Sequence, residues 1–403
     1  MRVVVVGAGI VGASCALAAA RAGCEVVVLE RGQVGSGTTS RGEGNVLVSD
    51  KAPGPELDLA LVSRSTWGRW AEELGPDPLE FEPKGGVVVA TAADALAPLA
   101  ELVAGQAVAG VAADAADTDA LLELEPHLAP DLPGGFHYPQ DAQVQPVLAA
   151  AAILAEAVRL GAVLRAGAEV VGVRRRVDAT LRAVLCADGA EVEADAVVNA
   201  AGTWGGQVGA ALGAPVPVLP RKGLILVTQP VPALVHHKVY SADYVANVAA
   251  STEGLETSCV VESTRGGTVL IGASRERVGF DPSVDPATVA VLAAQAVRLF
   301  PVLEQVQLMR VYRGFRPYCP DHLPVIGPDP RVHGVLHACG HEGAGVGLAP
   351  ATGELVAAHL TGADPMTTLG IDPAPFLPDR LLVGGGSEAA GSVVDGAGTG
   401  VLR

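Results

Sequence analysis

The stretch that decides the fold is residues 2–30, RVVVVGAGIVGASCALAAARAGCEVVVLE. Residues 3–6 are a β-branched block without polar alternation, which predicts a strand buried inside a parallel sheet. Small residues over 10–22 predict a helix, and residues 25–29 predict a second strand. Strand, turn, helix and strand form a β-α-β unit, which indicates a doubly wound nucleotide-binding domain.

The turn between the first strand and the helix is rich in glycine. It contributes Gly7, Gly9, Ile10, Val11 and Gly12. Glycines at this spacing let backbone N–H groups approach a pyrophosphate, and the helix N-terminus favours its negative charge. Glu30 ends the second strand, where its carboxylate can accept hydrogen bonds from ribose hydroxyls and would repel a 2′-phosphate. The motif therefore disfavours NADP and leaves FAD and NAD both open.

The composition excludes several classes of protein. The 403 residues allow two or three domains, and the 49% hydrophobic share excludes a disordered chain. The net charge of −17 argues against a nucleic-acid partner, which needs a basic surface. Six cysteines without CxxC or Cys/His spacing predict reduced thiols and no metal site. We expect a cytoplasmic protein without a membrane span, because glycines interrupt the uncharged run over 3–20.

Strand and helix patterns alternate at both ends of the chain, whereas the middle is rich in strands. This organisation predicts an α/β fold, with a Rossmann-type doubly wound domain and an inserted antiparallel-sheet domain. We expect the first domain to contain 1–85, 140–215 and 320–375, the second to contain 86–139 and 216–319, and 379–403 to be a mobile tail.

Three finer predictions concern single segments. Residues 94–129 are expected to be helical with interruptions, and residues 163–175 to form one strand. Residues 312–327 contain several prolines and are expected to form a loop.

Four further segments carry a resemblance to a known family. They are GSGTTS (35–40), VNAAGTW (198–204), GFRP (314–317) followed by PD (320–321) and PVIG (324–327), and GHEGAGVG (340–347). In this order they resemble the D-amino-acid oxidase superfamily of FAD-dependent oxidoreductases, which includes glycine oxidase, sarcosine oxidase and D-amino-acid dehydrogenase. The resemblance covers residues 1 to about 365. The stretch EGNVLVSDK (43–51) is most similar to the branch of opine oxidases and D-hydroxyproline dehydrogenases.

The resemblance implies FAD, held without a covalent bond, as the cofactor. Hydroxyl groups of the 35–40 loop suit phosphate and ribitol oxygens, and N–H groups of the 340–347 run suit the flavin ring. Cys339 is expected to pack in a strand rather than to bind the flavin. Besides the glycine turn and Glu30, the implied cofactor contacts are Arg31, Ser36, Thr38, Thr39, Ser40, Gly44, Asn45, Val170, Ala201, Gly202, Trp204, Gly314, Gly343, Ala344, Gly345, Val346 and Gly347.

Arg316 is the expected catalytic residue. A guanidinium offers a planar fork that matches a carboxylate, and the resemblance implies that this arginine anchors the substrate carboxylate. A structural pair with Asp321 is the alternative. Other residues expected at the substrate are Glu43, Tyr240, Tyr244 and His341. For the tyrosines the alternative is sheet packing, and for His341 it is loop bracing. Some relatives place a second cation at the positions of Gly343 and Ala344, which are neutral here.

The implied reaction is oxidation of the C–N bond of an amino acid, or of an N-substituted or cyclic amino acid. Hydride passes from Cα to flavin N5, giving an imine that can hydrolyse, and the electron acceptor is O₂ or another redox protein. One alternative is a flavin subunit of a hetero-oligomeric opine or imino-acid dehydrogenase, which passes electrons to a partner. The others are an NAD-dependent dehydrogenase and a non-catalytic dinucleotide-binding protein.

Overall fold

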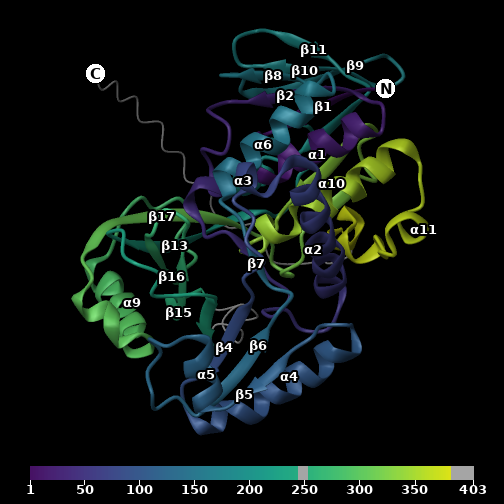
Figure 1. Cartoon of the computed structure of the whole chain (residues 1–403). Coiled ribbons are helices and arrows are strands. Elements are labelled where there is room, and N and C mark those ends of the chain that lie inside the picture. Colours follow the sequence, from purple (N-terminus) through teal and green to yellow (C-terminus); the bar gives the residue numbers. More distant parts are fainter. Residues whose placement is uncertain (244–252, 383–403) are drawn as a thin grey trace, which may run out of the picture.

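The computed structural model describes residues 1–243 and 253–382, and two large sheets organise them (Figure 1). The strands of the first sheet are β1 (Arg2–Val6), β2 (Glu25–Glu30), β8 (Val163–Ala166), β12 (Ala196–Asn199), β18 (Val325–Pro328) and β19 (Val335–Cys339). Their order is β18-β19-β12-β1-β2-β8, and every neighbouring pair is parallel except β18 with β19. Segments far apart in the sequence therefore build one parallel sheet.

Strand β1 lies in the middle of this sheet and is covered on both faces. Val3 and Val5 pack into one core, whereas Val4 and Val6 pack into another. The first core includes residues of α1 (Ile10–Arg21), α6 (Pro146–Arg159) and α10 (Gly345–Thr361). The second includes residues of a small sheet made of β9 (Val170–Arg175), β10 (Leu181–Cys186) and β11 (Glu191–Glu193). Burial on both faces explains the unbroken apolar run that predicted the doubly wound domain.

The second large sheet has the order β17-β13-β16-β15-β14-β4-β6-β5. Its strands are β4 (Gly86–Ala90), β5 (Asp114–Ala116), β6 (Gly134–Tyr138), β13 (Leu219–Thr228), β14 (Lys238–Ser241), β15 (Glu256–Ser263), β16 (Val269–Arg275) and β17 (Leu308–Tyr318). Neighbours are antiparallel except β14 with β4. Helix α9 (Pro286–Leu299) packs on β13, β15 and β16. The predicted fold class, a Rossmann-type domain with an added antiparallel sheet, is confirmed.

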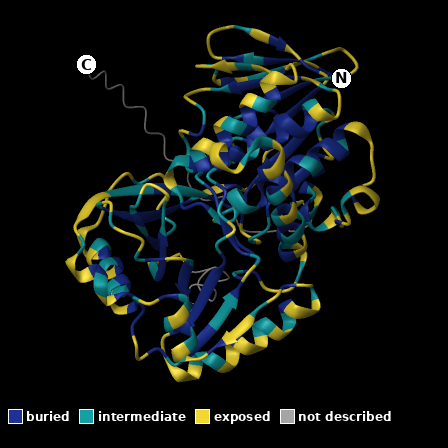
Figure 2. Cartoon of the chain, viewed as in Figure 1, coloured by how far each residue is buried: buried dark blue, intermediate teal, exposed yellow. Residues whose placement is uncertain are grey.

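The remaining elements surround these two sheets. They are α2 (Pro55–Leu74), α3 (Pro76–Leu79), α4 (Leu96–Val108), α5 (Thr118–Leu124), α7 (Gly205–Ala211), α11 (Pro365–Leu369), the pair β3 (Asn45–Val46) and β7 (Ala142–Gln143), and the 3-10 turns η1 (Thr38–Arg41), η2 (Ala93–Ala95), η3 (Gly202–Trp204), η4 (Pro301–Gln305), η5 (Ala374–Phe376) and η6 (Pro378–Leu381). Figure 2 shows buried strands inside and exposed outer faces on α4 and α9. Within the described ranges, no helix combines the length and apolarity needed to cross a membrane.

The loop predicted over 312–327 is limited to residues 319–324. Strand β17 continues to Tyr318, and β18 begins at Val325. Both are edge strands, because β17 pairs only with β13 and β18 only with β19 among the described strands. An edge strand has one side without ladder partners, so it tolerates Pro317, which has no N–H to donate. Pro317 therefore marks a sheet edge, whereas Pro320 and Pro324 lie in the connection between β17 and β18.

Two other segments also differ from expectation. Residues 94–129 contain a short strand, β5, between α4 and α5. The strand expected over 163–175 is two strands in different sheets, because β8 pairs with β2 whereas β9 pairs with β10.

The expected tail begins with ordered structure. Residues up to Leu381 form η6, and Arg380 Nε lies 2.7 Å from Asp321 Oδ2. Residues 383–403 of the expected tail lie outside the described residues.

Candidate active site

A cavity of about 440 Å³ lies where the carboxyl ends of β1 and β12 meet β13 and β17. Ligands in doubly wound folds bind at the carboxyl ends of the strands, so its position is the expected one. Its wall includes these residues expected at the cofactor: Gly7, Gly9, Ile10, Val11, Glu30, Arg31, Ser36, Thr38, Thr39, Asn45, Val170, Ala201, Gly202, Trp204, Gly314, Gly343, Gly345 and Val346. Of those expected at the substrate, it includes Glu43, Arg316 and His341.

The glycine turn forms a backbone cradle at one end of the cavity. Gly7 has a φ of +109°, and a Cβ there would lie 2.5 Å from Ala200 O. Helix α1 begins at Ile10, and its N-cap residue, Gly9, makes no side-chain hydrogen bond to the first turn. Gly9, Ile10 and Val11 line the cavity, so the positive end of the helix lies at its wall. Small residues, close backbone and a helix N-terminus fit the pyrophosphate of a dinucleotide.

Glu30 stands beside this cradle at the end of β2. Its Oε2 accepts a hydrogen bond from Ala8 N at 2.9 Å, and its Oε1 accepts one from Gly32 N at 2.7 Å. These bonds fix the carboxylate in the cavity wall. Two carboxylate oxygens offer about four acceptor positions, so lone pairs remain for ribose hydroxyls.

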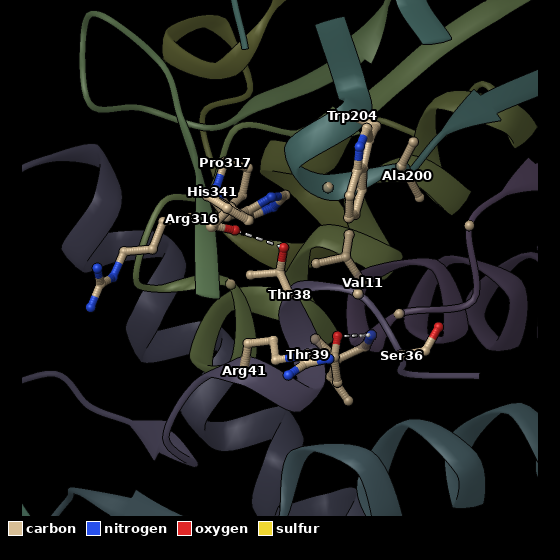
Figure 3. A pocket seen from close by; sticks show the side chains of 18 of the residues that line it. Val11, Ser36, Thr38, Thr39, Arg41, Ala200, Trp204, Arg316, Pro317 and His341 are labelled. Carbon is tan, nitrogen blue, oxygen red and sulfur yellow. Dashed lines mark hydrogen bonds between the residues drawn. The ribbon is translucent and has the colours of Figure 1, made fainter. Parts of the chain in front are cut away.

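Hydroxyl groups of the 35–40 loop brace the cavity wall (Figure 3). Thr39 Oγ1 accepts a hydrogen bond from Ile10 N at 3.1 Å, which ties the loop to the start of α1. Thr38 Oγ1 donates to Phe315 O at 2.9 Å and lies 2.8 Å from Thr203 Oγ1. The loop therefore joins the cradle to β17, the strand that carries Arg316.

Five described residues expected at the cofactor lie outside the wall. They are Gly12, Ser40, Gly44, Ala344 and Gly347. Ser40 Oγ donates to Ser36 O at 3.1 Å and so turns back into its own loop. A Cβ at Gly12 would clash with Gly7 O, so this glycine lets helix and turn pack closely. Ser40 and Gly12 support the cavity from behind it.

Arg316 extends from edge strand β17 across the neighbouring strands. Its Nη1 donates to Ser274 O at 2.9 Å. A Cβ at Gly223 would collide with Nη1, so this glycine of β13 makes room for the guanidinium. Figure 3 shows the side chain leading away from Thr38 and His341. Asp321, the acid considered as a structural partner, pairs with Arg380 instead.

His341 lies in the wall as a buried, neutral side chain. Its Nε2 lies 2.9 Å from Thr352 Oγ1 on α10, and burial lowers the pKa of the imidazole to about 3. The ring therefore carries no charge in the physiological range. It shapes the cavity and cannot serve as a second cation for a carboxylate.

The two tyrosines expected at the substrate have different outcomes. Tyr240 is fully buried, its hydroxyl is hydrogen-bonded to Ser49 Oγ, and the structure does not bring it to the cavity wall. Tyr244 lies outside the described residues.

Cys339 is buried at the end of β19 with Val216, Val218, Cys319 and Val325, as strand packing requires.

The prediction from sequence missed two wall residues on β13, Gly223 and Ile225. An isolated glycine inside a strand pattern is a known sign of close approach by another group. Gly223 lies in the strand-rich middle of the chain, so it carried that signal. Its partner, Arg316, is 93 positions away in the sequence, and only the fold reveals which group approaches.

Comparison with known proteins agrees with this geometry. The family model described as DAO, FAD dependent oxidoreductase, matches residues 2–359. A glycine oxidase of Geobacillus kaustophilus (strain HTA426) is 32% identical over 363 residues, covering 88% of this chain and 91% of that protein.

Solved structures agree as well. The crystal structure of glycine oxidase from Geobacillus kaustophilus has a TM-score of 0.83 at 29% identity, covering 94% of this chain and 99% of that chain. The structure of iminodiacetate oxidase from Chelativorans sp. BNC1 has a TM-score of 0.79 at 26% identity, covering 94% of this chain and 99% of that chain.

Proposed function

The chain belongs to the DAO family of FAD-dependent oxidoreductases, and we propose that it oxidises the C–N bond of an amino acid or of an N-substituted or cyclic amino acid. It is an enzyme of the amino-acid oxidase type, with FAD as its cofactor. One observation carries the substrate class: Arg316 and the glycine cradle line the same cavity. A guanidinium beside the cofactor site is suited to hold a carboxylate.

The work of the chain in this reaction is positioning. Bound FAD supplies the two-electron acceptor for the hydride that leaves the substrate α-carbon. Arg316 binds the carboxylate and thereby fixes the orientation of the α-carbon, while Gly223 leaves room for the guanidinium. His341 is neutral and buried, so it fills the wall without competing for the carboxylate. The imine that results is released and hydrolyses in water, or stays cyclic when the substrate is a ring amine.

Relatives support small amino acids as the first substrates to test. The compounds in the names glycine oxidase and iminodiacetate oxidase are a primary amine and a secondary amine, each next to a carboxylate. Both classes fit an anchor built on Arg316. The test therefore includes several amine classes.

The same proposal includes the division of the chain and its compartment. The six-stranded sheet supports a FAD domain of residues 1–85, 140–215 and 320–375, and the eight-stranded sheet supports a substrate domain of 86–139 and 216–319. All six cysteines are free thiols, which supports a reducing compartment such as the cytoplasm.

The experiment is anaerobic reduction of the purified flavoprotein by a panel of compounds. The panel holds glycine, iminodiacetate, D-amino acids, N-methyl amino acids, opines and cyclic imino acids, each paired with its hydroxy-acid or carbocyclic analogue where one exists. We expect loss of the flavin band at about 450 nm with one amine class and with no analogue. Bleaching by a hydroxy acid, or by no amine, would contradict the proposal.

Admitting air after reduction distinguishes the electron acceptors. Rapid return of the flavin band with formation of peroxide indicates an oxidase. Reduction of a dye without peroxide indicates a dehydrogenase, and would favour a flavin subunit that passes electrons to a partner.

A further inference from the structure

A buried cluster of charges lies at the substrate side of the cavity. Lys238 Nζ is 2.7 Å from Glu262 Oε2 and 3.4 Å from Glu43 Oε2. The three side chains come from β14, β15 and the loop after η1, and each is almost completely buried. Of the three, only Glu43 lies in the cavity wall. Two carboxylates and one ammonium form this cluster, and the charges of Lys84 and Arg316 also act on it.

Oε1 of Glu43 is the unusual atom of this cluster. Oε2 accepts a hydrogen bond from Asn45 Nδ2 at 3.2 Å, whereas Oε1 is buried and receives no hydrogen bond from any described residue. A buried carboxylate oxygen without a partner is costly, because burial removes the water that would solvate it. A cationic N–H donor in the cavity would supply the hydrogen bond that this oxygen lacks.

The side chains of Glu43 and Arg316 lie against neighbouring residues of the eight-stranded sheet. The guanidinium lies over Gly223, and Glu43 Oε1 lies against Gly272, whose Cβ position is 2.9 Å from Ile225 Cδ1. Gly223 and Ile225 are two residues apart on β13, and two residues of a strand span about 7 Å. The cavity wall thus presents a cation and an anion at a spacing of the order that one small amino acid can bridge.

We propose that Glu43 receives the amino group of the substrate: Oε1 accepts a hydrogen bond from the substrate ammonium and then takes one of its protons. This inference rests on the proposed function and makes zwitterionic amino acids the preferred class. In the transfer, an N–H bond breaks, an O–H bond forms on Oε1, and the electron pair of the N–H bond stays on nitrogen. The neutral amine that results has the lone pair needed to form the C=N bond.

The surroundings of Glu43 suit a proton acceptor. Burial raises the pKa of its carboxyl, Lys238 opposes the rise, Glu262 adds to it, and Arg316 opposes it. Tyr312 on β17 and Cys259 on β15 also feel its charge, and both stay neutral because burial raises their pKa values. A carboxyl with a raised pKa holds a received proton better than an ordinary glutamate does.

The first test measures binding rather than turnover, by titration calorimetry of the FAD-loaded protein. The probes are 2-aminoisobutyrate and 2-methylproline, which have no hydrogen on the α-carbon, against isobutyrate and cyclopentanecarboxylate, which have no amine. In the parent protein we expect at least one amine probe to bind ten times or more tighter than its amine-free partner, as a charge-assisted hydrogen bond allows. Glu43→Gln should bring this ratio close to one and leave the amine-free acid bound as well or better.

Two further variants serve as a conservative replacement and as a control. Glu43→Asp retains the charge one methylene further away and should keep part of the ratio. Glu156→Gln removes one negative charge from α6, outside the cavity wall, and should leave the ratio unchanged. An unchanged ratio in Glu43→Gln would overturn the inference, and the cluster would then only hold the loop to the sheet.

The second test is the pH dependence of kcat/KM with the best amine of the panel. In the parent, activity should fall on the acid side as Glu43 becomes protonated. In Glu43→Gln this acid-side fall of kcat/KM should move to the alkaline range, where the amine itself loses its proton in solution. A fall that stays in place would overturn the proton transfer. A parent that oxidises no amine at all would overturn the proposed function, and the inference with it.

Discussion

The proposed cofactor end and the proposed substrate end of the cavity are built from different parts of the protein. At the proposed cofactor end, the backbone forms the wall: Gly7 and Gly9 lie within one short turn, and the N-terminus of α1 follows directly. At the proposed substrate end, charged side chains form the wall, and two of them, Arg316 and Glu43, are 273 positions apart in the sequence. A local spacing in the sequence can therefore identify the proposed cofactor end. The proposed substrate end forms only when the strands that carry its residues have paired.

The largest effect is expected from Gly9→Leu, which attacks the backbone cradle. A Cβ at Gly9 would lie 3.0 Å from Thr39 Oγ1, and a leucine would extend further into the space for the pyrophosphate. We expect a folded protein with almost no FAD, measured as the flavin-to-protein absorbance ratio. Gly68→Ala on α2 is the control, because its Cβ would make only ordinary contact. Full yellow colour in Gly9→Leu would contradict the cradle.

The next largest effect is expected from Arg316→Ala, at the other end. A buried charge-assisted hydrogen bond is worth about 1.5–3 kcal/mol, so kcat/KM should fall about tenfold to hundredfold. Arg316→Lys should recover only part, because an ammonium cannot make the bidentate contact. FAD content should stay at the parent value in both variants, since Arg316 is expected to serve only the substrate end. Loss of FAD would instead show that the two ends are not separable.

A smaller effect is expected from Gly223→Ala. The added methyl would meet Arg316 Nη1, so the guanidinium must move. Overpacking of this kind costs about 1 kcal/mol or more, which corresponds to a rise in KM of about fivefold. Gly266→Ala, in the turn between β15 and β16, is the control, because its Cβ would make only an ordinary contact. Equal KM values in both variants would mean that the position of the guanidinium does not matter.

The smallest effect is expected from Glu30→Ala. One or two hydrogen bonds to ribose, each worth about 0.5–1.5 kcal/mol and somewhat more to a charged acceptor, would be lost. The Kd for FAD, measured by reconstitution of the apoprotein, should rise about tenfold while purified protein still holds FAD at high concentration. A protein as empty as Gly9→Leu would show that the carboxylate, and not the backbone, dominates the cofactor end.

The sequence predicted the β-α-β unit well because its determinants are local. The spacing of Gly7, Gly9 and Gly12 and the position of Glu30 depend on one β-α-β unit, and the structure places that unit as expected. The substrate end was harder. The resemblance identified Arg316, but the room made for it by Gly223 depends on which strands become neighbours.

The errors have physical causes of the same kind. Tyr240 was expected at the substrate because it lies in the strand-rich middle, yet its strand turns it into a buried network with Ser49. The prolines over 312–327 suggested a loop, yet Pro317 sits on an edge strand that needs no further donor. Side-chain direction and sheet position are set by long-range pairing, which the pattern of one segment does not contain.

The most direct test of the central claim is the rate of anaerobic flavin reduction by the best amino acid of the panel, measured with the parent and with Arg316→Ala at equal FAD content. We expect rapid bleaching of the parent and a second-order rate about tenfold to hundredfold lower in the variant. Bleaching of both proteins at the same rate would contradict it, because the carboxylate would then be held elsewhere or not at all.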